Sequence, residues 1–251
     1  MPIVRSIVFN ALFYTNLVVL MVLALPTLLL PGRSTIEMAK LWGRTSLWLL
    51  RVVCGTRVEF RGLDHIGHGP LIVAAKHQST WETFALLHLF EHPIFIIKRE
   101  LFWIPLFGWL AWKADMIGVD RGAGSQALAA MTERARAALG RGRQLMIFPE
   151  GTRRAAGAEP RYKFGVAHLY AAADVPCLPV ALNSGLFWPR RSFMRRPGTI
   201  VVEFLDPIAP GLDREAFFER LKDDIETATA RLIAEGEREL ARAAASERQT
   251  A

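Results

Sequence analysis

The sequence predicts an α/β protein: a central, mostly buried sheet flanked by helices, with an N-terminal hydrophobic helical hairpin for membrane attachment. Two observations carry this prediction. From Gly55 onward, short apolar runs alternate with segments of helical periodicity, the pattern of an α/β sandwich. Before that point the chain is dominated by the long apolar run Ile7–Leu30. A chain of 251 residues has room for one large domain and an appendage.

The apolar run Ile7–Leu30 is long enough to reach across a bilayer. As a helix it would measure roughly 36 Å, against a hydrocarbon core of about 30 Å. It is too long for the apolar part of a typical signal peptide, and no small-x-small cleavage pattern follows it. Pro31-Gly32 predicts a turn at its end. Because Arg5 and Arg33 flank both sides, the positive-inside rule gives no orientation, and both spanning and shallow insertion stay open.

The next segment, Ser34–Val53, has the pattern of an amphipathic helix. Its charged residues are spaced by three, four and seven positions, which places them on one helical face. They are Glu37, Lys40, Arg44 and Arg51. Such a helix is expected to lie in the membrane interface. We therefore predict a membrane-anchoring hairpin over residues 1–54, the alternative being two core helices of a soluble fold, and an α/β domain over residues 55–251.

The elements of the α/β domain follow from its periodicity. Strands are predicted at Arg57–Phe60, Leu71–Ala75, Ile94–Ile97, Met116–Val119, Leu145–Phe148, Cys177–Leu182 and Thr199–Leu205. Helices are predicted at Trp81–Phe90, Ser125–Ala138, Lys163–Ala173 and from Asp213 to about Ala243. The end of the chain, Ala244–Ala251, is expected to be frayed.

The net charge of the chain limits the classes of partner that it is expected to bind. A net charge of +7 and a pI of about 9.9 fit nucleic acid, anionic lipid or an anionic substrate. Seven tryptophans and fifteen phenylalanines, several beside arginines, favour a membrane interface over nucleic acid. The basic loop Arg190–Arg196 is expected to touch lipid headgroups or, alternatively, to be plainly solvated. Cys54 and Cys177 are too isolated for a disulfide framework or a zinc site, so no metal is expected.

The stretch AAKHQSTWETFAL, residues 74–86, places His77 directly after a predicted buried strand. Chemistry in α/β sheets gathers at such strand ends. If His77 lies in the turn and Glu82 in the first helical turn, the carboxylate can accept the Nδ1 proton and leave Nε2 as a base. Ser79-x-x-Glu82 is also a capping-box pattern, so Glu82 has an alternative role as a helix cap.

Three more strand ends carry charged residues. In MIFPEGTRR, Gly151 permits a tight turn and Arg153 can clamp an anion. Lys98 and Arg121 lie at the ends of two further strands. These groups could equally be ordinary rim charges. Motifs of serine esterases, P-loop ATPases, dinucleotide enzymes and zincins are missing from the sequence.

In this order, the motifs resemble those of the glycerophospholipid acyltransferase family, and most closely the bacterial 1-acyl-sn-glycerol-3-phosphate acyltransferases. The resemblance covers about residues 55–210, and FPEGTR is its most specific piece. It implies that His77 and Glu82 are catalytic, and that glycerol phosphate is held by the turn and by other cations. The implied substrate-binding residues are Lys98, Arg121, Glu150, Gly151, Thr152 and Arg153. The family usually has Asp where this chain has Glu82.

The resemblance implies transfer of a fatty acyl group from acyl-CoA or acyl-carrier protein to the sn-2 hydroxyl of lysophosphatidate, giving phosphatidic acid. This chemistry needs a base but no cofactor and no metal. The expected partners are membrane lipids, lysophosphatidate and the acyl thioester, without nucleic acid. The expected location is the inner membrane, with the active site on its cytoplasmic side. An acyltransferase with another lysolipid or amine-bearing acceptor, and a non-catalytic lipid-binding protein, remain alternatives.

Overall fold

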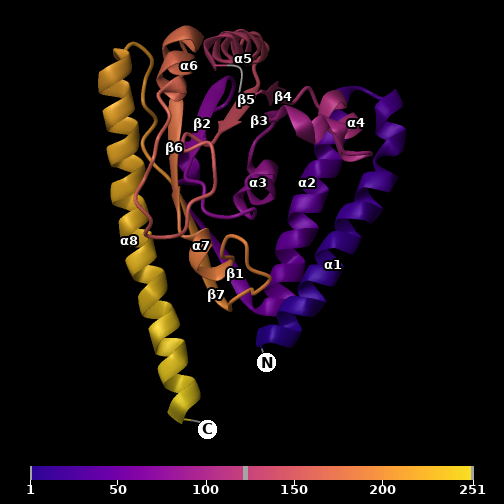
Figure 1. Cartoon of the computed structure of the whole chain (residues 1–251), viewed down its shortest axis with the longest axis vertical. Coiled ribbons are helices and arrows are strands. Elements are labelled where there is room, and N and C mark those ends of the chain that lie inside the picture. Colours follow the sequence, from indigo (N-terminus) through magenta and orange to yellow (C-terminus); the bar gives the residue numbers. More distant parts are fainter. Residues whose placement is uncertain (1, 121–123, 250–251) are drawn as a thin grey trace.

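The computed structural model describes residues 2–120 and 124–249, and within them a seven-stranded sheet separates two layers of helices (Figure 1). The strand order is β1-β7-β6-β2-β5-β3-β4. The strands are β1 (Thr56–Arg61), β2 (Leu71–Ala75), β3 (Pro93–Lys98), β4 (Ile117–Val119), β5 (Gln144–Ile147), β6 (Cys177–Leu182) and β7 (Gly198–Phe204). The helices are α1 (Pro2–Leu23), α2 (Gly32–Leu49), α3 (Glu82–Ala85), α4 (Phe107–Lys113), α5 (Gly124–Leu139), α6 (Gly165–Ala173), α7 (Ser184–Phe187) and α8 (Arg214–Gln249). The predicted α/β class is confirmed.

The directions of the strands decide where a site can form. Strand β2 runs parallel to β5 and β6, and β3 runs parallel to β4 and β5. At the other side of the sheet, β7 is antiparallel to β6 and parallel to β1. The carboxyl ends of β2, β3, β4, β5 and β6 therefore share one edge, where ligands of α/β sheets usually bind.

Strand β2 lies at the centre because both of its faces are covered. Leu71, Val73 and Ala75 join one hydrophobic cluster with residues of the hairpin and α3. Ile72 and Ala74 point the other way, into a cluster with α5, α6 and α8. This alternation explains why the whole run is apolar and buried, as expected for a strand in a parallel sheet.

The predicted helix Trp81–Phe90 is wrong in its extent. The structure has only the short α3, followed by a 3₁₀ turn at Leu87–Leu89. The side chains of this segment are apolar and buried on nearly every side: Trp81, Phe84, Ala85, Leu86, Leu87 and Phe90. One continuous helix would bury only a single stripe of them. The tighter, interrupted path buries them all against α2 and the sheet.

The N-terminal hairpin is present and packs against the sheet domain. After α1, a 3₁₀ turn at Leu25–Leu29 leads into α2, which ends in a π-helical turn at Leu50–Cys54. Phe9 and Phe13 of α1 are buried in the same hydrophobic cluster as β2. The segment Ile3–Leu29 is long and apolar enough to cross a membrane, and most of it is exposed on the protein. The division of the chain at residue 54 stays a prediction.

The buried face of α2 differs from the predicted one. Lys40, expected on a charged outer face, is buried, and its Nζ donates to Glu37 Oε1 at 2.7 Å and to the Glu91 carbonyl at 2.9 Å. Gly43 lies on the same face, where a Cβ would come within 2.6 Å of the Phe84 carbonyl oxygen. Gly43 therefore allows α2 to lie close to α3, and the hydrogen bonds of Lys40 compensate for the burial of its charge.

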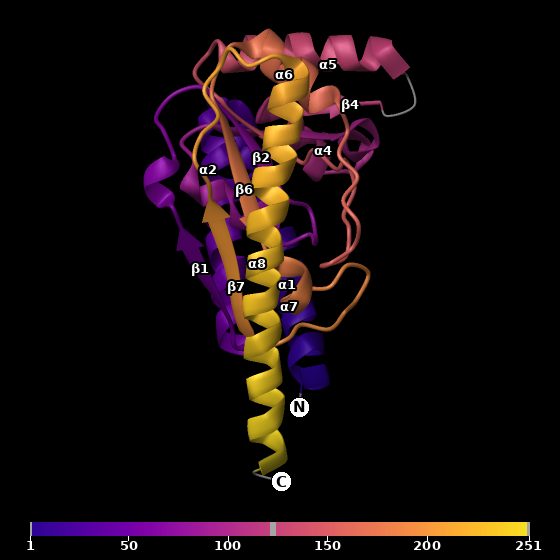
Figure 2. The same ribbon diagram turned by 90° about the vertical axis from the view of Figure 1, so that its left-hand side faces the viewer.

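Helix α8 continues to Gln249, so the predicted fraying from Ala244 is wrong for residues 244–249. The last turns contain Ala, Arg and Glu but neither Gly nor Pro, a composition that favours helix. Figure 2 shows α8 crossing the sheet and extending past the rest of the molecule at its C-terminal end. Its N-terminal half covers the sheet through Phe217, Leu221 and Ile225.

Candidate active site

The predicted pair His77 and Glu82 is assembled just past the carboxyl end of β2. The imidazole Nδ1 lies 2.9 Å from Glu82 Oε1, and the Glu82 side chain is fully buried. The same oxygen accepts the backbone N–H groups of Gln78 and Ser79, each at 2.7 Å. The other oxygen accepts the hydroxyl of Ser184 at 2.9 Å. A carboxylate that only accepts fixes the proton on Nδ1 and leaves Nε2 as an unprotonated base.

Besides its contact with His77, Glu82 makes one contact of the capping-box pattern, although Trp81 precedes α3 and no side chain caps that helix. Its carboxylate accepts the Ser79 N–H, as in a capping box, while the Ser79 hydroxyl accepts the Trp81 N–H at 2.8 Å. The backbone that it caps is the turn that carries His77. The longer Glu side chain reaches the imidazole without loss of the capping contacts. The cap therefore fixes the position of the carboxylate that orients the imidazole.

The imidazole plane is held by an aromatic ring. Phe148, directly after β5, stacks on His77 with ring centroids 4.0 Å apart and an interplanar angle of 15°. Phe95 of β3 stacks in turn on Phe148, with centroids 6.1 Å apart. Phe148 is the first residue of the FPEGTR motif, but the sequence does not show that it lies under the imidazole.

In the PEGTR turn, Glu150 points inward and Gly151 makes the bend. Gly151 has φ of 65°, and its N–H donates to the Phe148 carbonyl at 2.8 Å. The buried Glu150 carboxylate accepts from Lys76 Nζ at 3.1 Å and from the backbone N–H of His77 at 3.4 Å. Burial raises the pKa of Glu150, and the positive charge of Lys76 opposes that rise. Glu150 thus ties the β5 turn to the segment that carries the dyad.

The sequence does not predict a role for Lys76, but the structure places it in the buried ion network of the site. It is 3% exposed and bridges Glu150 to Glu226 of α8, whose Oε1 lies 2.6 Å from its Nζ. The Tyr162 hydroxyl donates to the same Glu226 oxygen at 2.8 Å. Burial and the Glu226 carboxylate raise the pKa of Tyr162. The available signal was a lysine at the end of a fully apolar strand, next to His77.

The predicted cationic residues differ in how near they lie to the dyad. Arg153 is half-buried, and its Nη1 donates to Thr80 Oγ1 at 2.5 Å, which puts it beside the loop between the dyad residues. Thr152 is exposed on the same turn. Lys98 is exposed at the end of β3, separated from β2 by β5. Arg121 lies outside the described residues.

The site therefore offers a base at Nε2, a guanidinium nearby and a buried ion network beneath both. Among the residues that the structure describes, no group of three or more His, Cys, Asp or Glu side chains could hold a metal ion. Both cysteines are buried, and burial raises the pKa of the Cys177 thiol. Neither cysteine belongs to the dyad or to the PEGTR turn.

Comparisons with known proteins identify the family of this chain. The family model described as Acyltransferase matches residues 57–183, which include the dyad, the PEGTR turn and β6. A 1-acyl-sn-glycerol-3-phosphate acyltransferase of Pseudomonas aeruginosa is 41% identical over 161 residues, which are 64% of this chain and 63% of that protein. The sheep 1-acyl-sn-glycerol-3-phosphate acyltransferase alpha is 32% identical over 80% of this chain and 70% of its own length.

The fold is also shared with a solved structure. The crystal structure of the 1-acyl-sn-glycerophosphate (LPA) acyltransferase of Thermotoga maritima matches with a TM-score of 0.77 at 22% sequence identity. The match covers 92% of this chain and 98% of that one. With the family model matching half of the sequence, the chain belongs to the acyltransferase family.

Proposed function

We propose that this protein transfers a fatty acyl group from a thioester donor to the sn-2 hydroxyl of 1-acyl-glycerol-3-phosphate, producing phosphatidic acid. The observation that carries the proposal is the His77–Glu82 contact of 2.9 Å, which leaves Nε2 as a base at the carboxyl edge of the sheet. The relatives in Pseudomonas and sheep are both named 1-acyl-sn-glycerol-3-phosphate acyltransferases, which supports this choice of acceptor.

The reaction needs one proton shuttle. His77 Nε2 takes the proton of the acceptor hydroxyl while its oxygen attacks the thioester carbonyl, because a free alcohol is a poor nucleophile at neutral pH. Glu82 stabilises the imidazolium that forms, as the carboxylate of a catalytic triad does. The C–S bond then breaks, and the imidazolium returns the proton to the thiolate, whose thiol has an ordinary pKa of about 8.5. An ester and a free thiol are the products.

Arg153 is the proposed contact for the acceptor phosphate. Its hydrogen bond to Thr80 occupies one of five guanidinium N–H groups and leaves the others for an anion. Gly151 and Thr152 shape the turn that presents it, and Glu150 holds that turn from below through Lys76. Lys98, at the end of β3, is proposed as a further cationic contact. Arg121 is proposed in the same role from its place in the family motif alone.

We propose that the hairpin attaches the enzyme to the inner membrane. The outward face of α1 is apolar and exposed, with Val4, Val18 and Leu23 each about half exposed or more. Near its N-terminal end α1 is bonded to the loop before β7, and the 3₁₀ turn after it packs on α4. Because α1 is held to the domain at both ends, it is proposed to insert into one leaflet of the membrane rather than to cross it. The active site would then face the cytoplasm, where a water-soluble acyl donor is present.

A thioester-release assay with a panel of acceptors tests the proposal. The full-length protein is given acyl-CoA or acyl-carrier protein with lysophosphatidate, glycerol 3-phosphate, or a lysolipid with an amine headgroup. The proposal expects one thiol per phosphatidic acid, and kcat/KM for lysophosphatidate at least about tenfold above the other acceptors. Preference for the amine-bearing lysolipid, or thiol release without any acylated product, would refute it.

A further inference from the structure

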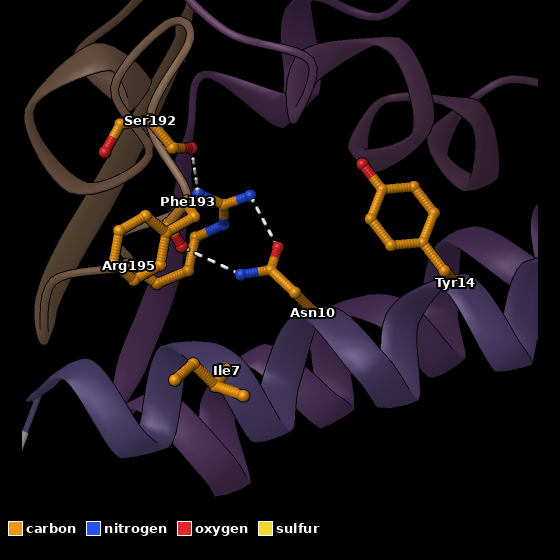
Figure 3. Close-up of a pocket in the computed structure, with 6 residues that line it drawn as sticks. All are labelled: Ile7, Asn10, Tyr14, Ser192, Phe193 and Arg195. Carbon is orange, nitrogen blue, oxygen red and sulfur yellow. Dashed lines mark hydrogen bonds between the residues drawn. The ribbon is translucent and has the colours of Figure 1, made fainter.

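A cavity lies away from the dyad, between α1 and the loop that joins α7 to β7 (Figure 3). Its volume is about 480 Å³. The residues that line it are Ile7, Asn10, Tyr14, Ser192, Phe193 and Arg195. The proposed acyl transfer uses none of them, so the cavity needs an explanation of its own.

The cavity contains a buried positive charge. Arg195 is 5% exposed, and its guanidinium donates to the carbonyls of Ser192 and Met194 at 2.8 and 2.9 Å and to Asn10 Oδ1 at 2.9 Å. It stacks over Trp188, 3.9 Å from the ring centroid. Its Nε has no partner among the described residues. All of these acceptors are neutral.

No carboxylate among the described residues balances this charge. Burial lowers the pKa of Arg195 to about 10, which still leaves it protonated at neutral pH. A buried charge without a counter-ion is costly, and neutral hydrogen bonds and ring stacking offset only part of that cost. An anion in the cavity would offset the rest of that cost.

The cavity is built from two distant segments that hold each other in place. The Asn10 amide donates to the Phe193 carbonyl at 2.8 Å, and the backbone N–H of Arg195 donates to Ser6 Oγ at 2.9 Å. These contacts fix the loop against α1 before any ligand arrives. Figure 3 shows the guanidinium between the loop and the helix, with Asn10 bonded to both Arg195 and Phe193.

The rim of the cavity is apolar and aromatic. Ile7, Tyr14 and Phe193 are 56%, 59% and 55% exposed. Tyrosine and phenylalanine at such a rim suit the boundary between lipid headgroups and acyl chains. The same loop carries further arginines at positions 190, 191 and 196. A free anion would use the charge but would leave this apolar rim uncovered.

We propose that this cavity binds one anionic phospholipid, with its headgroup phosphate on Arg195 and its acyl chains along the exposed face of α1. The lipid is a second one, separate from the acceptor at His77. It joins the loop before β7 to the membrane that α1 enters, and it supplies the counter-ion that Arg195 lacks. The inference does not depend on acyl transfer, and its failure would leave that proposal intact.

Binding of defined lipids to the full-length protein in a nonionic detergent tests this site. Short-chain phosphatidylglycerol is expected to bind about tenfold or more tightly than phosphatidylcholine of the same chain length. Arg195→Met should remove this preference. Arg191→Met removes the same charge from an exposed position of the same loop, and it should change phosphatidylglycerol binding by less than about threefold.

A second pair of variants leaves the hydrogen bonds of Arg195 intact. Ile7→Glu brings a carboxylate to the rim and should abolish the preference for phosphatidylglycerol. Val18→Glu places the same charge about 16 Å further along α1, at a position 50% exposed, and should keep it. Equal melting temperatures of the two variants show that folding is not the cause of any difference.

Three results would overturn the proposal. The first is equal affinity for phosphatidylglycerol and phosphatidylcholine in the unmodified protein. The second is a retained preference in a folded Arg195→Met or Ile7→Glu variant. The third is displacement of phosphatidylglycerol by inorganic phosphate at equal concentration, which would mean a site for free anions in which the apolar rim has no role.

Discussion

The buried carboxylate of Glu82 accepts hydrogen bonds from four different groups. It accepts the Nδ1 proton of His77, two backbone N–H groups and the Ser184 hydroxyl. Together these contacts fix both carboxylate oxygens, so the side chain has one orientation toward the imidazole. Ser184, at the start of α7, thereby connects the dyad to β6. The side chains of the site are therefore held in place by hydrogen bonds between distant parts of the chain as well as by their nearness in sequence.

Part of this site was predictable from residues. His77, Glu82 and the PEGTR turn follow from strand ends and local spacing. Ser184 and Glu226 could not be predicted, since their contacts with Glu82 and Lys76 join residues 102 and 150 positions apart. No local pattern encodes such a pairing, which arises from the order of β6 and β2 in the sheet and from the path of α8.

Arg153→Ala is expected to weaken use of lysophosphatidate far more than use of a neutral acceptor. A guanidinium–phosphate pair is a charge-assisted bidentate contact, stronger than a neutral hydrogen bond. We expect kcat/KM for lysophosphatidate to fall about a hundredfold, and that for a neutral monoacylglycerol by less than about tenfold. Steady-state kinetics on both acceptors measure this. Equal losses on the two would show that Arg153 has only a structural role.

The ionisation of Glu150 should leave a signature in stability. Burial raises the pKa of its carboxyl group above the ordinary value of 4.5, so the folded state holds this proton more tightly than the unfolded state does. Stability from this group is therefore complete below pH 4.5 and declines as the pH rises through the raised pKa. The melting temperature of the wild type, relative to Glu150→Gln, should fall across that window. A constant difference from pH 4 to 8 would contradict the raised pKa.

At the scale of elements, the hairpin and the sheet domain form one packed unit. Phe13 of α1 packs against Trp42 of α2, Phe84 of α3 and Trp188 after α7, with ring centroids 5.4 to 5.7 Å apart. The residues that attach the hairpin thus reach the segment that carries the dyad. The amphipathic pattern of α2 could not reveal this, because Lys40 and Gly43 are buried by tertiary contacts that the pattern does not contain.

Strands were easier to predict than helices in this chain. The bounds of β2 and β6 agree with the predicted ones, because buried parallel strands appear as short apolar runs between turns. The segment from Trp81 to Phe90 has a similar apolar content, but its path is set by packing against α2. Apolar composition alone does not distinguish a long helix from two short turns.

Gly43→Ala tests the close approach of α2 and α3. Its new Cβ would meet the backbone carbonyl of Phe84 at 2.6 Å, so the helix must move away from the dyad segment. We expect a loss of roughly 1–3 kcal/mol in the free energy of unfolding. Gly67→Ala is the matched control, since nothing lies within 4 Å of its Cβ. Chemical denaturation in detergent compares the two, and equal stability of both variants would contradict the account of this contact.

At the scale of the whole molecule, the apolar exposed surface is extensive and lies on more than one element. Besides α1, three tryptophans of the segment around α4 are exposed: Trp103, Trp109 and Trp112. The 3₁₀ turn after α1 packs against α4, so these surfaces adjoin one another. A broad surface of this kind is expected to insert into a bilayer more firmly than a basic loop could bind it.

Membrane extraction should distinguish these two modes of attachment. The full-length protein is expected to stay in the membrane pellet in high salt and in alkaline carbonate and to enter the supernatant with detergent. Salt screens surface charge but leaves apolar burial intact. Release by about 1 M salt alone would instead assign attachment to the arginines of the loop Arg190–Arg196.

The central claim is that His77, oriented by Glu82, is the base for acyl transfer to lysophosphatidate. The most direct measurement is kcat for phosphatidic acid formation by the wild type, His77→Ala and Glu82→Gln, with folding checked by melting temperature. Loss of a positioned base should lower kcat about 10³-fold or more in His77→Ala, and Glu82→Gln should be strongly impaired while still folded. If folded Glu82→Gln kept a nearly full rate, the carboxylate would be only a helix cap, and the proposed dyad would be wrong.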